Sequence, residues 1–367
     1  MVNTANGLSP SATWDRLTWD AAGRRLFLGL RNDGVVALPF GAPVGGLLGA
    51  AGTPFAVANS SGCNGFVVAG ALGFAGEAAG FTGTGGVYGK GVTVYNMSTM
   101  AVVRTLPVAN GVGVDNGVYD ANSQQVIFTL VNGSLFTVSA LTGAPLKTGS
   151  ISTPPCDPSL PCDPLQFPVV DGSGGMYVTV PMENAVLKID TRTLAQLARF
   201  DTKAYGCLDP TGLALDTVNA RLLVGCGDAG APQLLALDAR TGARMASVPI
   251  GRGNDGVVYD AQRRLIFASS GAVGTITVVQ QYVDTSGADS YAVREALFTK
   301  AGARTLAYDP QTGAVFTMAP DGRYNPALPV NADMAGGVFT ANEFVPNSIE
   351  VLVYQPTWAS SSGRRHR

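Results

Sequence analysis

Polar side chains stand at corresponding places just ahead of several short apolar runs in the sequence. A hard cation such as Ca²⁺ needs about six oxygen ligands, and carboxylates, amides and water can together supply them. A guanidinium group can bind a carboxylate through two hydrogen bonds. If the runs are strands that start at one end of a channel, these side chains form a polar ring for a cation or a small polar ligand. The residues of this ring are Asp15, Asp115, Asn116, Gln166, Thr211, Asn254, Asp255 and Arg304.

Histidine chemistry is excluded from the body of the chain, because the one histidine, His366, lies in the tail Ser-Gly-Arg-Arg-His-Arg. A Ser–His–Asp triad, a Cys–His pair and a histidine-rich metal site therefore cannot form there. No cofactor is predicted beyond a channel-bound cation such as Ca²⁺. The polar ring also has a purely structural interpretation, in which its side chains hold water and tie neighbouring strands together.

The composition indicates a globular protein rich in strands. Only 14% of the 367 residues are charged and 46% are hydrophobic, whereas about 25% of residues are charged in an average soluble domain. The net charge of −2 provides no basic surface for nucleic acid. No run of apolar residues is long enough to predict a membrane span, and the N-terminal residues lack the basic and apolar regions of a signal peptide.

The apolar runs recur in a repeat that must position the polar ring. In each copy a run ends in an acidic residue or an asparagine, a short turn follows, and a second apolar run begins. The spacings between these anchor residues lie between 39 and 61, and a period near 45 is typical of four-stranded propeller blades. We therefore predict an all-β, seven-bladed β-propeller with four antiparallel strands in each blade. The anchors are Asp20, Asn59, Asp120, Asp171, Asp216, Asp260 and Asp309.

The second blade and the last blade depart from this repeat. The second blade is placed at 53–106, with Asn59 as a degenerate anchor, Pro54 at the ring position and a Gly/Ala-rich insertion at 70–89. The last blade has no obvious fourth strand, so residues 1–10 are predicted to supply it and to close the ring.

The chain is expected to form one propeller domain. This domain covers residues 1–357, and the last ten residues, 358–367, are expected to form a flexible tail that is polar and basic. Nothing in the composition separates a second domain from the repeats.

The five cysteines leave their pairing open. Cys156 and Cys162 flank a short proline-rich loop, where they form either a small disulfide or two free thiols. Cys207 and Cys226 belong to one blade, and each is expected to be a buried thiol or part of a disulfide. Cys63 is expected to be free.

Three stretches of the chain carry a resemblance to a known family. They are Trp-Asp-Arg-Leu-Thr-Trp-Asp-Ala-Ala-Gly-Arg-Arg-Leu-Phe-Leu at 14–28, Gly-Val-Val-Tyr-Asp-Ala-Gln-Arg-Arg-Leu-Ile-Phe-Ala at 256–268, and the repeat at 303–316 with the ending Ser-Ile-Glu-Val-Leu-Val-Tyr at 348–354. The chain resembles the YVTN-repeat, YncE-like propellers and, more distantly, lactonase-type propellers. It is a poor match for WD40 propellers, whose Gly-His signature needs histidine. The resemblance implies an exported protein, periplasmic or extracellular.

Three functions remain open for such a chain. The first is a non-catalytic scaffold that presents a loop-rich face and the channel mouth to a protein, a glycan or a small ligand. The second is a lactonase-like hydrolase, although none of the five glutamates precedes a predicted first strand, where a calcium cage would need one. The third is a structural or surface assembly module, which the low charge and the high Gly, Ala and Thr content indicate. The long connections expected to share the binding face are 70–90, 151–166 and 319–348.

Overall fold

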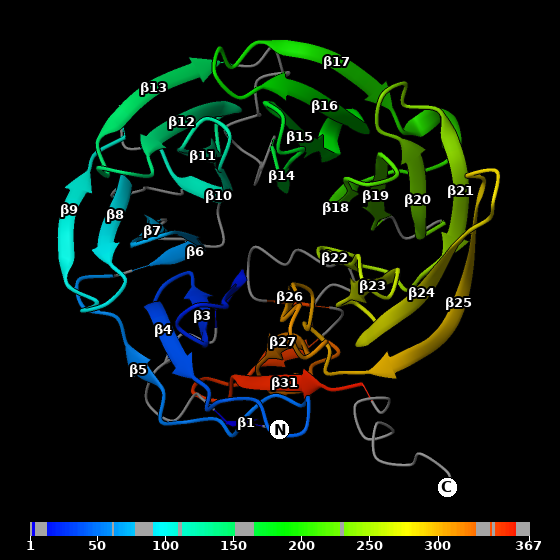
Figure 1. Ribbon diagram of the computed structural model, residues 1–367. Coiled ribbons are helices and arrows are strands. Elements are labelled where there is room, and N and C mark those ends of the chain that lie inside the picture. The colour runs from blue at the N-terminus through cyan, green and yellow to red at the C-terminus, as the bar shows by residue number, and fades with distance from the viewer. Residues whose placement is uncertain are drawn as a thin grey trace, which may run out of the picture.

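The computed structural model describes residues 2–3, 13–60, 62–77, 91–108, 112–150, 165–227, 231–327, 338–339 and 342–356. Seven four-stranded antiparallel sheets follow one another around a ring (Figure 1). The predicted seven-bladed β-propeller is therefore confirmed. The helical elements in the described residues are two single 3-10 turns, η2 (Pro181–Glu183) and η3 (Lys203–Tyr205), and no helix there is long and apolar enough to cross a bilayer.

Blades I to VII are numbered in ring order, and the strands of each are given from the centre outward. Blade I contains β2 (Leu17–Asp20), β3 (Arg25–Leu30), β4 (Gly34–Pro39) and β5 (Phe55–Ala56), and blade II contains β6 (Cys63–Ala69), β7 (Leu72–Glu77), β8 (Gly91–Asn96) and β9 (Val102–Leu106). Blade III contains β10 (Val114–Asp120), β11 (Gln125–Leu130), β12 (Ser134–Ser139) and β13 (Pro145–Ser150), and blade IV contains β14 (Pro168–Val170), β15 (Gly175–Val180), β16 (Ala185–Asp190) and β17 (Gln196–Asp201). Blade V contains β18 (Pro210–Asp216), β19 (Arg221–Cys226), β20 (Gln233–Asp238) and β21 (Arg244–Pro249), and blade VI contains β22 (Val257–Asp260), β23 (Leu265–Ser270), β24 (Thr275–Val283) and β25 (Asp289–Phe298). Blade VII contains β26 (Ala307–Tyr308), β27 (Val315–Ala319), β31 (Glu350–Tyr354) and β1 (Val2–Asn3).

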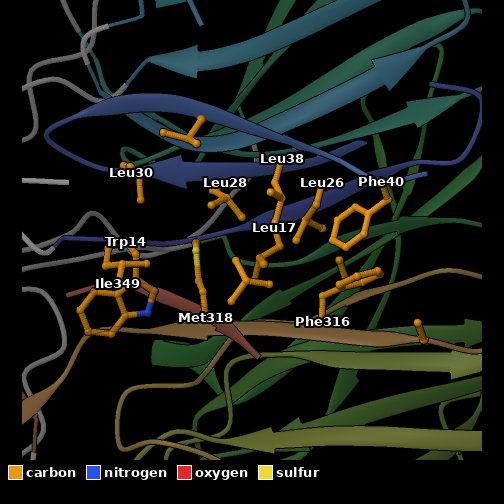
Figure 2. Close-up of a cluster of buried hydrophobic side chains, with 14 of the residues drawn as sticks. Trp14, Leu17, Leu26, Leu28, Leu30, Leu38, Phe40, Phe316, Met318 and Ile349 are labelled. Carbon is orange, nitrogen blue, oxygen red and sulfur yellow. The ribbon is translucent and has the colours of Figure 1, made fainter. Parts of the chain in front are cut away.

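The two ends of the chain meet in blade VII, as the sequence predicts. The N-terminal strand β1 pairs antiparallel with β31, Val2 opposite Val351. Blades VII and I are then joined by a buried apolar cluster (Figure 2), in which Phe316 and Met318 of β27 face leucines of blade I. The Trp19 ring stacks on Phe316 with ring centroids 5.1 Å apart. Burying each of these large side chains contributes about 1.5–3 kcal/mol, so the closure is largely a hydrophobic interface.

Aspartates end most of the first strands, because each caps the turn that follows. The Asp120 carboxylate accepts the N–H of Asn122 at 3.0 Å, and the Asp260 carboxylate accepts the N–H of Gln262 at 3.0 Å. Such a side chain satisfies a backbone donor that the turn leaves unpaired. The other aspartate anchors, Asp20, Asp171, Asp216 and Asp309, accept turn N–H groups in the same way.

The predicted placement of blade II is wrong. Phe55 pairs with Ala37, so the run that ends at Asn59 is the outer strand of blade I. The first strand of blade II is instead β6, and β7 occupies residues that were expected to be an insertion. The β6–β7 turn is the two-residue Gly70-Ala71 with Gly70 at φ +61°. A two-residue turn needs no capping aspartate. Blade II therefore has no acidic residue that marks the end of its first strand in the sequence.

One face of the ring carries the connections that the sequence singled out. We call it the start face, because the first strand of every blade begins there. Antiparallel pairing puts the connections between second and third strands, and those between blades, on this same face. Residues 78–90, 151–164 and 328–337 lie outside the described residues. The described part of the last connection forms a small separate sheet, whose strands are β28 (Gly322–Tyr324), β30 (Asn342–Phe344) and β29 (Val338–Phe339).

Blade V is cross-linked internally by a disulfide. Cys207, just before β18, bonds to Cys226 at the end of β19, with the two sulfurs 2.00 Å apart. Cys63 is a free, buried thiol, and burial, with Glu77 and Asp15 nearby, raises its pKa well above its usual value. Cys156 and Cys162 lie outside the described residues.

Replacing both members of this pair, Cys207→Ser with Cys226→Ser, is expected to lower the free energy of unfolding by about 3 kcal/mol, because a loop of this length then gains freedom in the unfolded chain. Denaturant unfolding under non-reducing conditions measures the loss. The control is Cys63→Ala, which removes a buried sulfur without removing a cross-link and should cost clearly less. Equal losses in the two variants would contradict a stabilising bridge.

Candidate functional site

The first strands are brought together at the start face by hydroxyl groups that reach from one blade to the next. Thr179 Oγ1 of blade IV donates to the carbonyl oxygen of Thr211 in blade V at 2.9 Å. Ser269 of blade VI donates in the same way to Arg304 O, and Thr305 of blade VII donates to Asp15 O. These bonds hold the residues ahead of the first strands in fixed positions around the centre of the ring.

Asp15, Asp255 and Arg304 form a buried ionic cluster at this end. Arg304 lies 3.8 Å from the carboxylate of Asp15 and 3.5 Å from that of Asp255, and its Nη2 donates to Trp14 O at 2.7 Å. A second cation, Arg31 from the end of β3, holds Asp15 at 2.6 Å. These side chains are therefore buried and paired with one another.

A second group forms around Asp115. Asn116 Nδ2 donates to one carboxylate oxygen of Asp115 at 2.7 Å, and Asn64 Nδ2 donates to the other at 3.3 Å. Arg16 connects the two groups, since its pKa responds to Asp15, Asp115 and Asp255. Its guanidinium also reaches across the ring from blade I to blade IV, with Cζ 2.9 Å from the centre of the Phe167 ring. A cation over an aromatic face is a favourable contact when both are desolvated.

The charges of this site are shifted by burial and by one another. Burial lowers the pKa of Arg16 to about 10, although the three carboxylates oppose the shift. Burial would raise the pKa of Asp15, but Arg31 and Arg304 hold it below its ordinary value. Burial and the neighbouring Asp15 raise the pKa of Asp255 to about 6, against the effect of Arg304. Asp255 is thus the carboxylate that can change charge near neutral pH.

Three predicted ring residues make backbone contacts outside the ionic cluster. Gln166 donates its N–H to Thr179 O, and Thr211 donates its hydroxyl to Asp209 O. Asn254 Nδ2 donates to Ser269 O at 2.6 Å. Pro54, the ring position proposed for the second blade, belongs to the connection before β5 and is not at the start of a first strand.

The sequence analysis missed Arg16, Arg31, Asn64 and Phe167. Asn64 was missed because blade II was misplaced. Blade II nevertheless shares with three other blades a polar residue followed by glycine, within the first residues of the first strand or just before it. The pairs are Asn64-Gly65, Asn116-Gly117, Thr211-Gly212 and Asp255-Gly256. At Gly256 a Cβ would lie only 3.0 Å from Arg304 O, so glycine permits the close approach of the next blade. This polar residue–glycine pair would have located blade II.

The site does not fit a hard cation. The carboxylate oxygens that Ca²⁺ would use are already bound by Arg31, Arg304, Asn64 and Asn116, and a guanidinium repels a cation. In the described residues no group of three or more His, Cys, Asp or Glu side chains is placed to hold a metal ion. Nε and Nη2 of Arg16, which are donors, have no hydrogen-bond partner within the described protein, nor has the acceptor Oδ1 of Asn116.

Comparisons with known proteins identify a fold without a family. No family model matches the chain, and no curated protein matches it. Among solved structures, the chain is similar to one in "Crystal Structure of Mitotic Checkpoint Complex", with a TM-score of 0.62 and 14% sequence identity. The match covers 86% of this chain and 92% of that chain. Identity this low shows a shared fold alone.

The raised pKa of Asp255 predicts a pH dependence of stability. Because folded Asp255 binds its proton more tightly than the unfolded chain does, its contribution is favourable below about pH 4 and is lost as the pH rises toward 6. The difference in unfolding free energy between Asp255→Asn and the wild type should therefore shift in favour of the variant by up to ~3 kcal/mol between pH 4 and 7. Urea unfolding at several pH values measures this.

The control for that series is Asp171→Asn, whose effect should have the opposite sign. Burial would raise the pKa of Asp171, but hydrogen bonds from Ser173 and Gly175 hold it below its ordinary value. The wild type therefore gains stability from Asp171 as the pH rises to about 4, so the variant should fall behind below about pH 4 and then keep a nearly constant difference up to pH 7. If both variants shift in the same direction, the assignment of the titrating group to Asp255 is wrong.

Arg304 is expected to be the most sensitive residue of the ionic cluster. Arg304→Met removes the cation shared by Asp15 and Asp255 and leaves buried negative charge uncompensated, which costs about 3–5 kcal/mol. Thermal or denaturant unfolding measures the loss. Arg323→Met, at an exposed position of β28, is the control and should change stability by less than about 0.5 kcal/mol. A loss below 1 kcal/mol for Arg304→Met would show that the cluster tolerates the change.

Proposed function

We propose that the protein is a non-catalytic binding propeller that takes a protein partner on its start face. The support lies in the small sheet β28–β30–β29, which the connection between β27 and β31 builds on that face. All three residues of its edge strand, β28, are exposed, and the Tyr324 side chain is 76% exposed. Tyrosine and arginine are enriched in the energetic centres of protein interfaces, and Arg323 and Tyr324 are consecutive exposed residues of β28.

This sheet is firmly attached to the propeller, as a binding platform needs to be. Phe344 of β30 packs edge-on against Trp14 with ring centroids 4.8 Å apart. Gly302 permits this contact, since a Cβ there would come within 2.7 Å of the Trp14 ring. Lys300 pairs with Asp321 at 2.6 Å at the start of the sheet. A preorganised platform loses little entropy when it binds.

The chemistry at the centre of the ring supports a binding role over a catalytic one. Its carboxylates are engaged with guanidinium and amide groups, so a hydrolase would have to break these pairs to free a base or a metal ligand. We place the lactonase-like hydrolase second and the surface assembly module third. Kinship with YVTN-repeat propellers belongs to this proposal as well, and the Cys207–Cys226 disulfide supports the exported location that such kinship implies.

The test compares a start-face variant with a variant of the opposite face. Immobilised wild-type protein captures a partner from extracts, and the partner is identified, purified and titrated by calorimetry. Arg323→Ala with Tyr324→Ala should weaken binding at least tenfold, because truncating an interface hot spot costs about 2 kcal/mol or more. Val218→Ala with Arg240→Ala, both exposed on turns of blade V at the opposite face, should leave the affinity unchanged.

Three results would contradict the proposal. Equal affinity of the start-face variant and the wild type for every purified partner would show that this face is not the binding surface. Turnover of simple lactones by the purified chain would favour the hydrolase instead. Elution as a large regular assembly at low concentration would favour the assembly module.

A further inference from the structure

One hollow in the wall of the propeller has an apolar floor and a charged rim. It lies between blades VI and VII (Figure 1) and has a volume of about 380 Å³, which is within the range of small-ligand pockets, about 300–1,000 Å³. Phe267 and Val278 of blade VI and Val315 of blade VII line it and are buried. Arg294 and Glu295 of β25 line it and are exposed. The hollow can therefore take an apolar group inside and charged groups at its opening.

Arg294 and Glu295 can line the same hollow because Arg294 is the extra residue of a β-bulge. In a regular strand two consecutive side chains point to opposite faces of the sheet. Val278 of β24 is opposite Glu295, but the next residue, Val279, is opposite Val293, so Arg294 has no residue of its own opposite it. A bulge of this kind redirects a side chain. Both charges are thus placed at the rim of one apolar hollow.

The outer strands of blades II to V have a bulge at the corresponding place, but there the extra residue is apolar. These extra residues are Val103, Leu146, Leu197 and Met245. None of the residues that follow them carries a negative charge, since they are Arg104, Lys147, Ala198 and Ala246. The arginine and the carboxylate at the bulge of β25 are therefore a property of blade VI and are not required by the bulge itself.

Both rim charges keep free hydrogen-bonding capacity. Arg294 Nη1 donates to Gln280 Oε1 at 3.1 Å, which fixes the guanidinium, whereas its Nε and Nη2 make no hydrogen bond within the described residues. The Glu295 carboxylate makes no hydrogen bond or ion pair there, either with Arg294 or with another side chain. A guanidinium can bind a carboxylate through two parallel hydrogen bonds, and a carboxylate accepts hydrogen bonds from an ammonium group. The rim thus offers a place for a negative group beside a place for a positive group.

We propose that this hollow binds a free amino acid with an apolar side chain. The apolar side chain lies against Phe267, Val278 and Val315, the carboxylate accepts hydrogen bonds from Arg294, and the ammonium group donates to Glu295. An amino acid carries its two charged groups on one carbon atom, and the two rim charges belong to consecutive residues. Burial of the apolar side chain drives binding, and the rim selects a zwitterion over a molecule with a single charge.

This site is separate from the surface in the proposed function. It is formed by blades VI and VII, whereas Arg323 and Tyr324 belong to the small sheet on the start face. The inference therefore stands whether or not the start face binds a protein. The Arg323→Ala with Tyr324→Ala variant should bind the amino acid as the wild type does, which keeps the two proposals distinguishable.

Calorimetric titration of the full chain with four small molecules tests each part of the site. The probes are L-phenylalanine, glycine, which lacks the apolar side chain, phenethylamine, which lacks the carboxylate, and 3-phenylpropanoate, which lacks the ammonium group. Phenylalanine should bind at least about threefold more tightly than either analogue with a single charge, because each analogue loses hydrogen bonds at the rim. Glycine should not bind measurably, because it places nothing in the hollow. The proposal is overturned if phenylalanine does not bind at up to about 10 mM, or if an analogue or glycine binds as tightly.

Two substitutions test the assignment of the charges. Glu295→Gln should lower the affinity for phenylalanine to about that for 3-phenylpropanoate and leave the affinity for 3-phenylpropanoate unchanged. Arg294→Gln should lower the affinity for phenylalanine to about that for phenethylamine and leave the affinity for phenethylamine unchanged. The controls Glu343→Gln and Arg240→Gln, at exposed positions outside the hollow, should bind phenylalanine as the wild type does. If either rim variant also does so, the proposal is wrong.

A third substitution tests where the apolar group lies. Leu297 of β25 lines the hollow, so Leu297→Asp should weaken phenylalanine binding at least about tenfold, because a charge cannot be left beside a buried apolar group without cost. The matched control is Leu197→Asp, at an exposed leucine in the outer strand β17 of blade IV, which should bind as the wild type does. Thermal unfolding shows that both variants are folded. Equal affinities of the two variants for phenylalanine would overturn the placement in this hollow.

Discussion

Closing the ring between blades VII and I is the constraint on which the rest of the structure depends. The chain passes from β1 of blade VII into blade I, so the ring is closed inside blade VII, where β1 pairs with β31, and side chains then pack blade VII against blade I. Apolar packing around Phe316 supplies most of the contact (Figure 2). At the centre, Arg304 of blade VII bonds to Trp14 O and pairs with Asp15 of blade I. A charge placed there must be compensated because it is buried.

That compensation shapes what the protein can do. Three arginines and three aspartates occupy the centre of the start face, and they neutralise one another when Asp255 is ionised. Arg16 even reaches Phe167 in blade IV, so the set ties together blades that are not neighbours. A centre whose carboxylates are engaged in this way stabilises the ring. In the function that we propose, recognition belongs to the added sheet on the start face.

The sequence and the structure agree where local chemistry repeats. The aspartate anchors, the strands between them and the N-terminal closing strand follow from alternation, turn residues and spacing, which act over a few residues. Blade II was misplaced where that local signal failed, because a two-residue turn at Gly70 replaces the aspartate turn and Asn59 imitates an anchor. The polar residue–glycine pairs mark where one blade approaches the next, but their meaning depends on knowing that neighbour.

The sequence by itself determined the all-β ring, its seven blades and, outside blade II, the starts of the first strands, since each depends on patterns local to one blade. Only the tertiary structure decided which of those side chains meet. Arg31 binds Asp15, Asn64 binds Asp115, and Arg16 crosses to Phe167. These partners belong to different strands or to different blades, so their distances are set by the curvature of the ring. Each buried charge is then stabilised by the polar or oppositely charged group that lies nearest to it. The spacing of residues along the chain does not specify which group that is.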